Sequence, residues 1–198
     1  TGISLAPYSE RDNFVLSGIG DKITADIRAD IRDGKRMKEI FTEYQPEIVF
    51  HLAAQPLVRL SYDIPVETYE VNVMGTIHVM EAIRATPSVK VGVMITTDKC
   101  YDNNEQEEGY VETDPFGGYD PYSSSKGACE VAIQSWRRSF FNPQDYGSTH
   151  TVSLASVFIP TARLLYIPVS IFFKASGLAP IFFASSIAFS GFIPFAIS

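Results

Sequence analysis

Cysteine and basic residues are scarce in this sequence, and each scarcity excludes a class of protein. The two cysteines, Cys100 and Cys129, are too few for a disulfide framework and lack the spacing of metal ligands. The 16 Lys and Arg residues are scattered in a chain of net charge −7, whereas nucleic-acid binding requires a basic stripe. We therefore expect no metal site, no nucleic-acid partner and a reducing compartment such as the cytoplasm.

The first residues, TGISLAPYSERD, also lack the features of a secretory signal peptide. They contain neither a basic n-region nor a continuous apolar run. Export is not expected.

Charged residues nearly disappear towards the end of the sequence. No acid follows Asp145, and beyond residue 150 the only basic residues are Arg163 and Lys174. Residues 175–198 are long enough to cross a bilayer, but prolines interrupt them and Ser and Gly weaken their hydropathy. We do not expect a membrane helix. A shifted reading frame and an association-prone tail remain as alternatives.

Hydrophobic patterning in the first 150 residues predicts a parallel α/β domain. Residues 48–52 form a short apolar run typical of a strand covered on both faces. Residues 66–85 carry apolar side chains every three or four positions, which predicts a long helix. A buried strand is indicated by the alternation of Val89, Val91, Val93 and Ile95. An acidic loop over 102–118 follows this strand. Strands and helices joined in this order form parallel sheets, whose ligands bind beyond the carboxyl ends of the strands.

The segment ITTDKCY, residues 95–101, places polar side chains where a strand is predicted to end. A second helix is expected from Asp120 and Pro121, because Asp caps and Pro opens helices. Within it, Tyr122 and Lys126 are four residues apart and project from one face. We expect the Lys126 ammonium to lower the pKa of the Tyr122 phenol, so that the phenolate acts as a base. The simpler alternative is a surface Tyr and Lys.

Four long motifs together carry a resemblance to a known family. They are EIVFHLAAQPLVRLSY at 47–62, NVMGT at 72–76, TTDKCYDN at 96–103 and GGYDPYSSSKG at 117–127. With them the chain resembles the extended short-chain dehydrogenases/reductases of the epimerase/dehydratase group, and among these the CDP-glucose 4,6-dehydratases. The resemblance runs from about Gly2 to Val157, roughly half of a full-length member, and implies a doubly wound Rossmann-type parallel sheet that binds NAD.

The resemblance also implies roles in catalysis. Thr97 would hydrogen-bond the hexose 4-hydroxyl, Tyr122 would remove its proton, and Lys126 would hold the nicotinamide ribose. Asp98 resembles the general acid of water elimination across C5 and C6. Lys99 stands where related dTDP-glucose enzymes carry a carboxylate base, and it could act as a base only when neutral.

Cofactor contacts are implied for two further segments. Asp30 and Ile31 resemble the residues that contact adenine after the third strand of the family. Leu52, Ala53 and Ala54 resemble the segment that passes under the adenosine, where small side chains allow the backbone to approach. The alternatives are a solvated carboxylate for Asp30 and plain strand packing for the two alanines.

Three polar residues rank below these in the resemblance. Asn72 is expected to tie its helix to the strand ends. Gln55 and Arg59 follow a strand directly and could face a nucleotide sugar, although an exposed arginine is as often solvated.

The chain departs from the family at both ends. TGISLAP resembles the end of a second strand, so no glycine-rich turn precedes it, and we expect a sheet without its central strand, apolar strand edges left exposed and poor NAD binding. Nothing after Val157 resembles the family's substrate domain. We therefore expect residues 1–157 to form a partial NAD-binding domain with the catalytic residues, and residues 158–198 to be an aberrant apolar tail.

The resemblance implies an NAD-dependent lyase that converts CDP-glucose to CDP-4-keto-6-deoxyglucose for a surface polysaccharide such as O-antigen. Two alternatives remain. A nucleotide-sugar 4-epimerase would share Thr97, Tyr122 and Lys126 but would not need Asp98 and Lys99. A truncated, non-catalytic remnant would keep the sheet and a homo-oligomer surface on the helices at 65–85 and 120–141.

Overall fold

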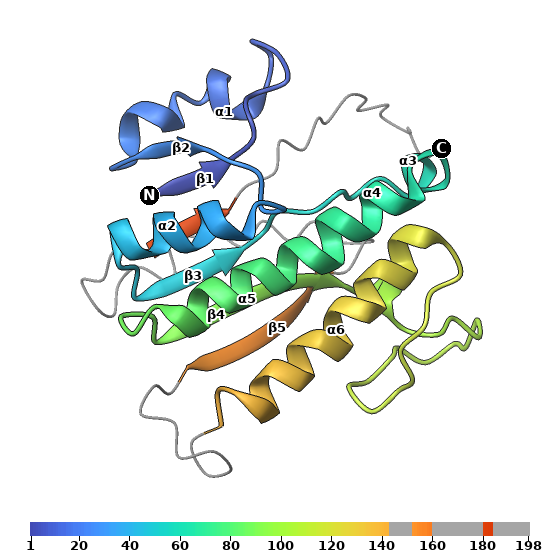
Figure 1. Ribbon diagram of the computed structural model, residues 1–198. Helices are drawn as coiled ribbons and strands as arrows, with labels where there is room; N and C mark the ends of the chain where they lie inside the picture. The colour runs from blue at the N-terminus through green and yellow to red at the C-terminus, as the bar shows by residue number, and fades with distance from the viewer. Residues whose placement is uncertain (143–151, 160–179, 184–198) are drawn as a thin grey trace.

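The computed structural model describes residues 1–142, 152–159 and 180–183, which build a parallel sheet with a layer of helices over it (Figure 1). The strands are β1 (Gly2–Ser4), β2 (Asp26–Arg28), β3 (Ile48–His51), β4 (Val91–Thr97), β5 (Ser153–Ile159) and β6 (Pro180–Phe183). Their order across the sheet is β2-β1-β6-β3-β4-β5, and every pair is parallel.

The helices are α1 (Asn13–Leu16), η1 (Ile19–Lys22), α2 (Gly34–Tyr44), α3 (Val58–Asp63), α4 (Pro65–Tyr69), η2 (Glu70–Met74), α5 (Gly75–Ala85), η3 (Asp98–Cys100) and α6 (Pro121–Ser139). Among them, α2, α5 and α6 lie side by side over one face of the sheet (Figure 1). The predicted parallel α/β class is confirmed.

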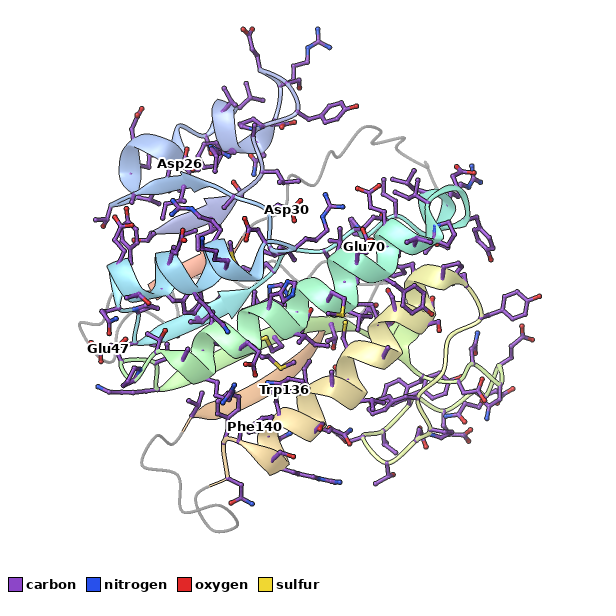
Figure 2. All side chains as sticks on the ribbon, in the orientation of Figure 1. Asp26, Asp30, Glu47, Glu70, Trp136 and Phe140 are labelled. Atoms are coloured by element: carbon purple, nitrogen blue, oxygen red, sulfur yellow. The ribbon has the colours of Figure 1, made fainter. Side chains whose placement is uncertain are left out.

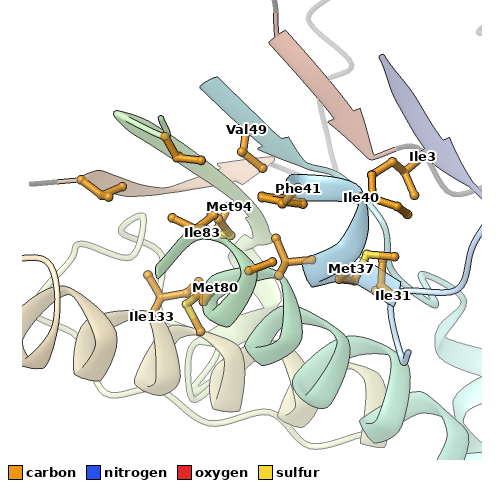
Figure 3. Close-up of a cluster of buried hydrophobic side chains, with 14 of the residues drawn as sticks. Ile3, Ile31, Met37, Ile40, Phe41, Val49, Met80, Ile83, Met94 and Ile133 are labelled. Carbon is orange, nitrogen blue, oxygen red and sulfur yellow. The ribbon is translucent and has the colours of Figure 1, made fainter. Parts of the chain in front are cut away.

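The hydrophobic core fills the space between the sheet and these three helices (Figure 3). Phe41 from α2, Ile83 from α5 and Ile133 from α6 are fully buried against Val49 of β3 and Met94 of β4. Burying one such side chain contributes about 1.5–3 kcal/mol. The core therefore fixes all three helices relative to the strands whose ends they flank.

Strand β4 lies inside the sheet, between β3 and β5, and its burial differs in detail from the prediction. Within β4, Val91, Val93 and Ile95 are only half-buried, whereas Gly92, Met94 and Thr96 on the other face are buried; Val89, just before the strand, is buried as predicted. Met94 belongs to the core under the helices. Because side chains alternate along a strand, Thr96 faces the same helical layer as Met94.

The long helix expected over residues 66–85 is present but is not one regular α-helix. Two α-helical parts, α4 and α5, are joined by the π-helical turn η2, and Figure 1 shows them as one nearly straight rod. A π-turn inserts an extra residue and re-aims the side chains around it. In η2 this turn carries the buried Asn72.

Helix α6 begins as predicted. The Asp120 carboxylate accepts a hydrogen bond from the Ser123 amide at 3.0 Å and another from the Ser123 hydroxyl at 2.6 Å, and Pro121 is the first helical residue. These contacts satisfy one of the amides left free at a helix start. Because Tyr122 lies in that first turn, the cap also places its side chain.

Strand β6 occupies the position between β1 and β3. It pairs with both neighbours, Gly2 facing Phe182 and Val49 facing Ile181. The expectation that exposed apolar edges would flank an empty central position is therefore wrong, because a segment far along the chain pairs with both edges. Strand β5 runs to Ile159, slightly beyond the limit of the resemblance. The remainder of the predicted tail, residues 160–179 and 184–198, lies outside the described residues.

Within the part of the chain that the structure describes, no helix is both long and apolar enough to cross a membrane. The same residues contain no cluster of three His, Cys, Asp or Glu side chains suited to a metal ion.

Candidate active site

The carboxyl end of β4 turns directly into the 3-10 helix η3, which gathers the predicted Thr97, Asp98 and Lys99. Thr97 is the N-cap of η3 and is buried. Its hydroxyl donates to Asp98 Oδ1 at 3.1 Å and lies 3.4 Å from the Lys99 amide. The three residues are thus held in one tight turn at the strand end.

Helix α6 packs against η3 and brings Tyr122 and Lys126 to the same place. Both side chains are buried, with 9% of Tyr122 and 5% of Lys126 exposed. Lys126 Nζ donates a long hydrogen bond of 3.5 Å to the carbonyl of Ile95 in β4. The surface alternative is excluded, since the pair lies against the strand end rather than in solvent.

The phenol of Tyr122 does not have the lowered pKa that its spacing from Lys126 predicted. Burial raises its pKa above the usual value of 10, and the nearby Asp98 and Asp120 carboxylates act in the same direction. Hydrogen bonding with Thr97 opposes the rise. The prediction was wrong because it considered the neighbouring charge and not the loss of water around the phenol.

Lys126 also responds to burial. Its pKa is lowered because the ammonium has lost its water, while Cys129, Glu130 and Cys100 act in the opposite direction. Lys99, in contrast, is exposed. The role of Lys99 as a base stays a prediction.

Asp30 lies just beyond β2, near Glu70 of η2 (Figure 2). Arg32 uses both oxygens of the Asp30 carboxylate, with contacts of 2.8 Å from its amide and of 2.9 and 2.7 Å from its guanidinium. Burial raises the pKa of Asp30, but the hydrogen bonds and charge of Arg32 outweigh it and leave the pKa below its usual value. Asp30 is therefore neither a freely solvated acid nor an unoccupied acceptor.

The other predicted cofactor residues fall into two groups. Ile31 is buried, and a Cβ added to Gly75 would meet its side chain at 2.5 Å, so it packs on α5. Leu52, 40% exposed, follows the end of β3, with Ala53 and Ala54 half-buried after it. The segment 52–54 thus lies at the same sheet edge as Thr97, because β3 and β4 are parallel neighbours.

A buried polar network connects the segment after β3 to η2 and α6. Asn72 accepts from the Gln55 amide at 2.7 Å and donates to the Gln55 carbonyl at 3.1 Å and to Ser125 Oγ at 2.9 Å. Asn72 therefore ties its helix to the strand end, as expected. The Gln55 side chain is buried against Leu57 and Thr68 rather than turned towards a ligand.

Several residues of the site had no distinctive sequence signal. Ser61 accepts a hydrogen bond from the Tyr122 amide at 3.2 Å and is fully buried. Glu130 is buried and accepts a short hydrogen bond from Thr96. Tyr101 stacks on Tyr110 and anchors the acidic loop. The spacing of Glu130 four residues after Lys126 was the one available signal, since it places both on one helix face.

Close backbone contact holds the acidic loop against α6. The Gly117 amide donates to the Cys100 carbonyl at 2.8 Å. A Cβ on Gly127 would come within 2.6 Å of the Gly117 carbonyl oxygen, so only glycine fits there without movement. The loop, η3 and α6 therefore form one packed unit around Tyr122.

Comparison with known proteins agrees with this geometry. The sequence model of the GDP-mannose 4,6 dehydratase family matches residues 19–144. The chain belongs to this family. It is 56% identical over 144 residues to a CDP-glucose 4,6-dehydratase of Salmonella typhimurium, covering 73% of this chain and 40% of that protein. It is 30% identical over 171 residues to a dTDP-glucose 4,6-dehydratase of Escherichia coli, covering 74% and 45%.

Solved structures agree on the fold. The UDP-Glc/GlcNAc 4-epimerase of Campylobacter jejuni superposes with a TM-score of 0.63 at 18% identity, covering 78% of this chain and 44% of that one. A double mutant of the dTDP-glucose 4,6-dehydratase from Streptomyces venezuelae, with NAD bound, gives 0.61 at 20% identity over the same shares. The Rossmann-type fold is confirmed. The chain spans about 40% of the length of the Salmonella relative.

Proposed function

We propose that the protein is an NAD-dependent sugar-nucleotide 4,6-dehydratase that converts CDP-glucose to CDP-4-keto-6-deoxyglucose. The observation that carries the proposal is the buried Tyr122–Lys126 pair of α6, packed against the Thr97-Asp98-Lys99 turn, in a chain 56% identical to a CDP-glucose 4,6-dehydratase. A catalytic phenol, a hydroxyl and an acid meet at the carboxyl end of a parallel strand, where ligands bind in such sheets.

NAD is the proposed cofactor, and only some of the residues predicted to contact it are placed to do so. The small side chains of Ala53 and Ala54 leave the backbone open to an adenosine, and Lys126 supplies a buried cation for a ribose. Asp30 and Ile31 fit less well, because Arg32 occupies the carboxylate and Ile31 packs in the core. When bound, NAD would accept the hydride from C4 of the hexose and later deliver it to C6.

The residues of the site supply the proton transfers. Tyr122, as phenolate, takes the proton of the 4-hydroxyl, which Thr97 orients by a hydrogen bond. The resulting 4-keto group acidifies the C5 proton. Asp98 protonates the C6 hydroxyl, which leaves as water while the C5 proton passes to a base and a C5–C6 double bond forms. Lys99 is the proposed base, and it would return a proton to C5 when the hydride reaches C6.

The dehydratase proposal is favoured over a 4-epimerase by the turn after Thr97. Epimerisation exchanges hydride at C4 and needs no acid beside C6, whereas here Asp98 is held by Thr97 at 3.1 Å next to the catalytic hydroxyl. A CDP-paratose 2-epimerase of Salmonella typhi is 33% identical over 129 residues. The two reactions are therefore distinguished by identifying the product.

The test is to incubate the purified chain with NAD and CDP-glucose and to follow the alkaline chromophore of keto sugars, with product analysis by mass spectrometry. Loss of one water from the sugar nucleotide is expected. Product of unchanged mass would identify an epimerase. Binding of neither NAD nor CDP-glucose would identify the chain as a non-catalytic remnant. Tyr122→Phe is the matched control, because it removes only the phenolic oxygen.

We further propose a homo-oligomer formed through α4, α5 and α6. Apolar side chains along these helices remain exposed, namely Val66 of α4, Met74 of the connecting turn η2 and Val131 of α6. Exposed apolar side chains on neighbouring helices are typical of interfaces. Light scattering should give at least twice the chain mass, and Val131→Glu should shift it towards the monomer.

The domain assignment and the cellular setting are part of the same proposal. Residues 1–157 would carry the cofactor and catalytic residues, with residues 158–198 as a distinct segment from which 180–183 joins the sheet. A 4-keto-6-deoxy sugar nucleotide made in the cytoplasm would supply the synthesis of a surface polysaccharide such as O-antigen. Fractionation of cells and analysis of their polysaccharide after deletion would test this.

A further inference from the structure

Two ionisable side chains, one basic and one acidic, are buried on the same helix in the described part of the chain. Lys126 is 5% exposed and Glu130 is 2% exposed, and no other Asp, Glu, Lys or Arg among the described residues is buried. Both belong to α6, one helical turn apart, on the face that also carries Tyr122. Burying a lone charge is costly, so the pairing on one helix face needs an explanation.

Glu130 also contacts the strand that carries the catalytic threonine. The Thr96 hydroxyl donates a short hydrogen bond to Glu130 Oε1, and Thr96 directly precedes Thr97 in β4. A hydrogen bond to a charged acceptor is about twice as strong as a neutral one. Through this hydrogen bond, Glu130 connects the end of β4 to α6, the helix that carries Tyr122 and Lys126.

Three further titratable groups that interact with Lys126, namely Cys100, Cys129 and His51, carry no charge near neutral pH. Burial raises the pKa of Cys100, in η3, to about 12, and that of Cys129, on α6, is raised as well. On β3, burial lowers the pKa of His51 to about 3, so its ring is neutral. Of the three groups that raise the pKa of Lys126, Glu130 is therefore the one that can carry a negative charge, because both thiols are protonated.

We propose that Glu130 is a positioning residue of the dehydratase site: it supplies the negative charge that balances the buried Lys126 ammonium and, through Thr96, keeps Thr97 aligned with Tyr122. The inference rests on the proposed function for its catalytic part. Its electrostatic part concerns the chain alone and is tested without substrate.

The two contributions are separated by two substitutions. Glu130→Gln keeps the size of the side chain and an oxygen for Thr96 but removes the charge. Thr96→Val removes the donated hydrogen bond but keeps the charge, and Thr96→Ser restores the hydroxyl. Glu43→Gln, an exposed acid on α2, controls for the loss of one carboxylate.

The first readout is the titration of Lys126 Nζ by NMR of lysine-labelled protein, assigned with Lys126→Met. The chain has seven lysines, which keeps the spectrum simple. Glu130→Gln should move the Lys126 midpoint to lower pH, because the ammonium loses its counter-charge. Thr96→Val and Glu43→Gln should leave it nearly unchanged. An unchanged midpoint in folded Glu130→Gln protein would overturn the electrostatic role.

The second readout is turnover of CDP-glucose. Glu130→Gln should lower kcat about tenfold and move the alkaline limb of its pH profile to lower pH. Thr96→Val should lower kcat without moving that limb, and Thr96→Ser should recover it. If kcat of Glu130→Gln fell only in proportion to the fraction of folded protein, and its pH profile did not move, Glu130 would have a packing role alone. If the wild-type protein did not turn over CDP-glucose, the proposed function would be refuted. The titration of Lys126 would still test whether Glu130 supplies its counter-charge.

Discussion

At the scale of single residues, burial rather than neighbouring charge decides how the site titrates. The spacing of Tyr122 and Lys126 correctly predicted that the two would share a helix face, because helix geometry is local. It did not predict the raised pKa of Tyr122, since that depends on β4 and η3 covering the phenol. Glu130 was missed for the same reason: an acid on a helix has no sequence mark that distinguishes a buried from a solvated position.

Tyr122 is expected to ionise above the usual value for a phenol. The phenolate absorbs in the ultraviolet, so a pH titration of wild-type protein minus Tyr122→Phe isolates its midpoint. Because the base form accumulates as pH rises, kcat should increase with pH on the acid side and fall by about 10²–10⁴ in Tyr122→Phe. A midpoint below 10, the usual value, would contradict a rise of the phenol pKa by burial.

His51 is expected to make the fold sensitive to mild acid. Its Nε2 lies 2.9 Å from Thr76 Oγ1, whose own proton goes to the Asn72 carbonyl at 2.6 Å, so Nε2 carries the hydrogen of a neutral ring. Burial lowers its pKa from 6.5 to about 3. The folded pKa is depressed, so this stability is full above pH 6.5 and is lost as the pH falls towards the folded pKa.

Urea unfolding provides the measurement for His51. The free energy of unfolding should fall by about 2 kcal/mol between about pH 7.5 and about pH 5 from this residue alone. His51→Gln, which keeps a donor for Thr76, should remove that part of the slope and leave the part due to carboxylates. Equal slopes in both proteins would contradict a neutral buried His51.

At the scale of elements, the site is held where loop, 3-10 helix and α6 pack on one another. The start of α6 followed from Asp120 and Pro121, whose effects are local. The π-turn η2 did not follow from the apolar spacing, because it depends on Asn72 reaching both Gln55 and Ser125. Gln55 was likewise misplaced: a polar residue after a strand looks alike whether it faces a ligand or a buried threonine.

Gly127→Ala is expected to loosen this packing. Alanine favours a helix interior by about 1 kcal/mol over glycine, but its Cβ would lie 2.6 Å from the Gly117 carbonyl and 3.1 Å from that of Cys100. Overpacking against backbone costs about 1–3 kcal/mol, so a net loss of stability is expected in urea unfolding. Gly109→Ala, where the added carbon meets nothing within 4 Å, is the matched control. A variant as stable as that control would refute the close contact.

At the scale of the whole molecule, the parallel sheet was predictable and the strand at its centre was not. Apolar runs at 48–52 and 89–97 identified β3 and β4, because strands inside a sheet leave a clear apolar pattern in the sequence. The partner of β1 and β3 is set by contacts across the full length of the chain. Nothing in the local pattern of residues 180–183 indicates which edge they join.

Proline in β6 should separate the two halves of the sheet. Phe182→Pro removes a backbone donor from a strand paired on both sides, a position where proline is not accommodated. A loss of about 3 kcal/mol or more is expected in urea unfolding, whereas Phe182→Ala keeps the amide and serves as the comparison. Equal stability of the two variants would show that the ladder at β6 contributes nothing.

The central position of β6 also has a consequence for how the chain folds. In the described sheet, β1 and β2 form one block and β3, β4 and β5 another, and β6 alone joins them. During synthesis the first block emerges early, yet its strands cannot be linked to the second block by strand pairing until residue 180 has left the ribosome. Pairing of Gly2 with Phe182 closes a very long loop, so this step should be slow. Refolding should therefore show a late phase, in which β6 pairs with β1 of one preformed block and β3 of the other.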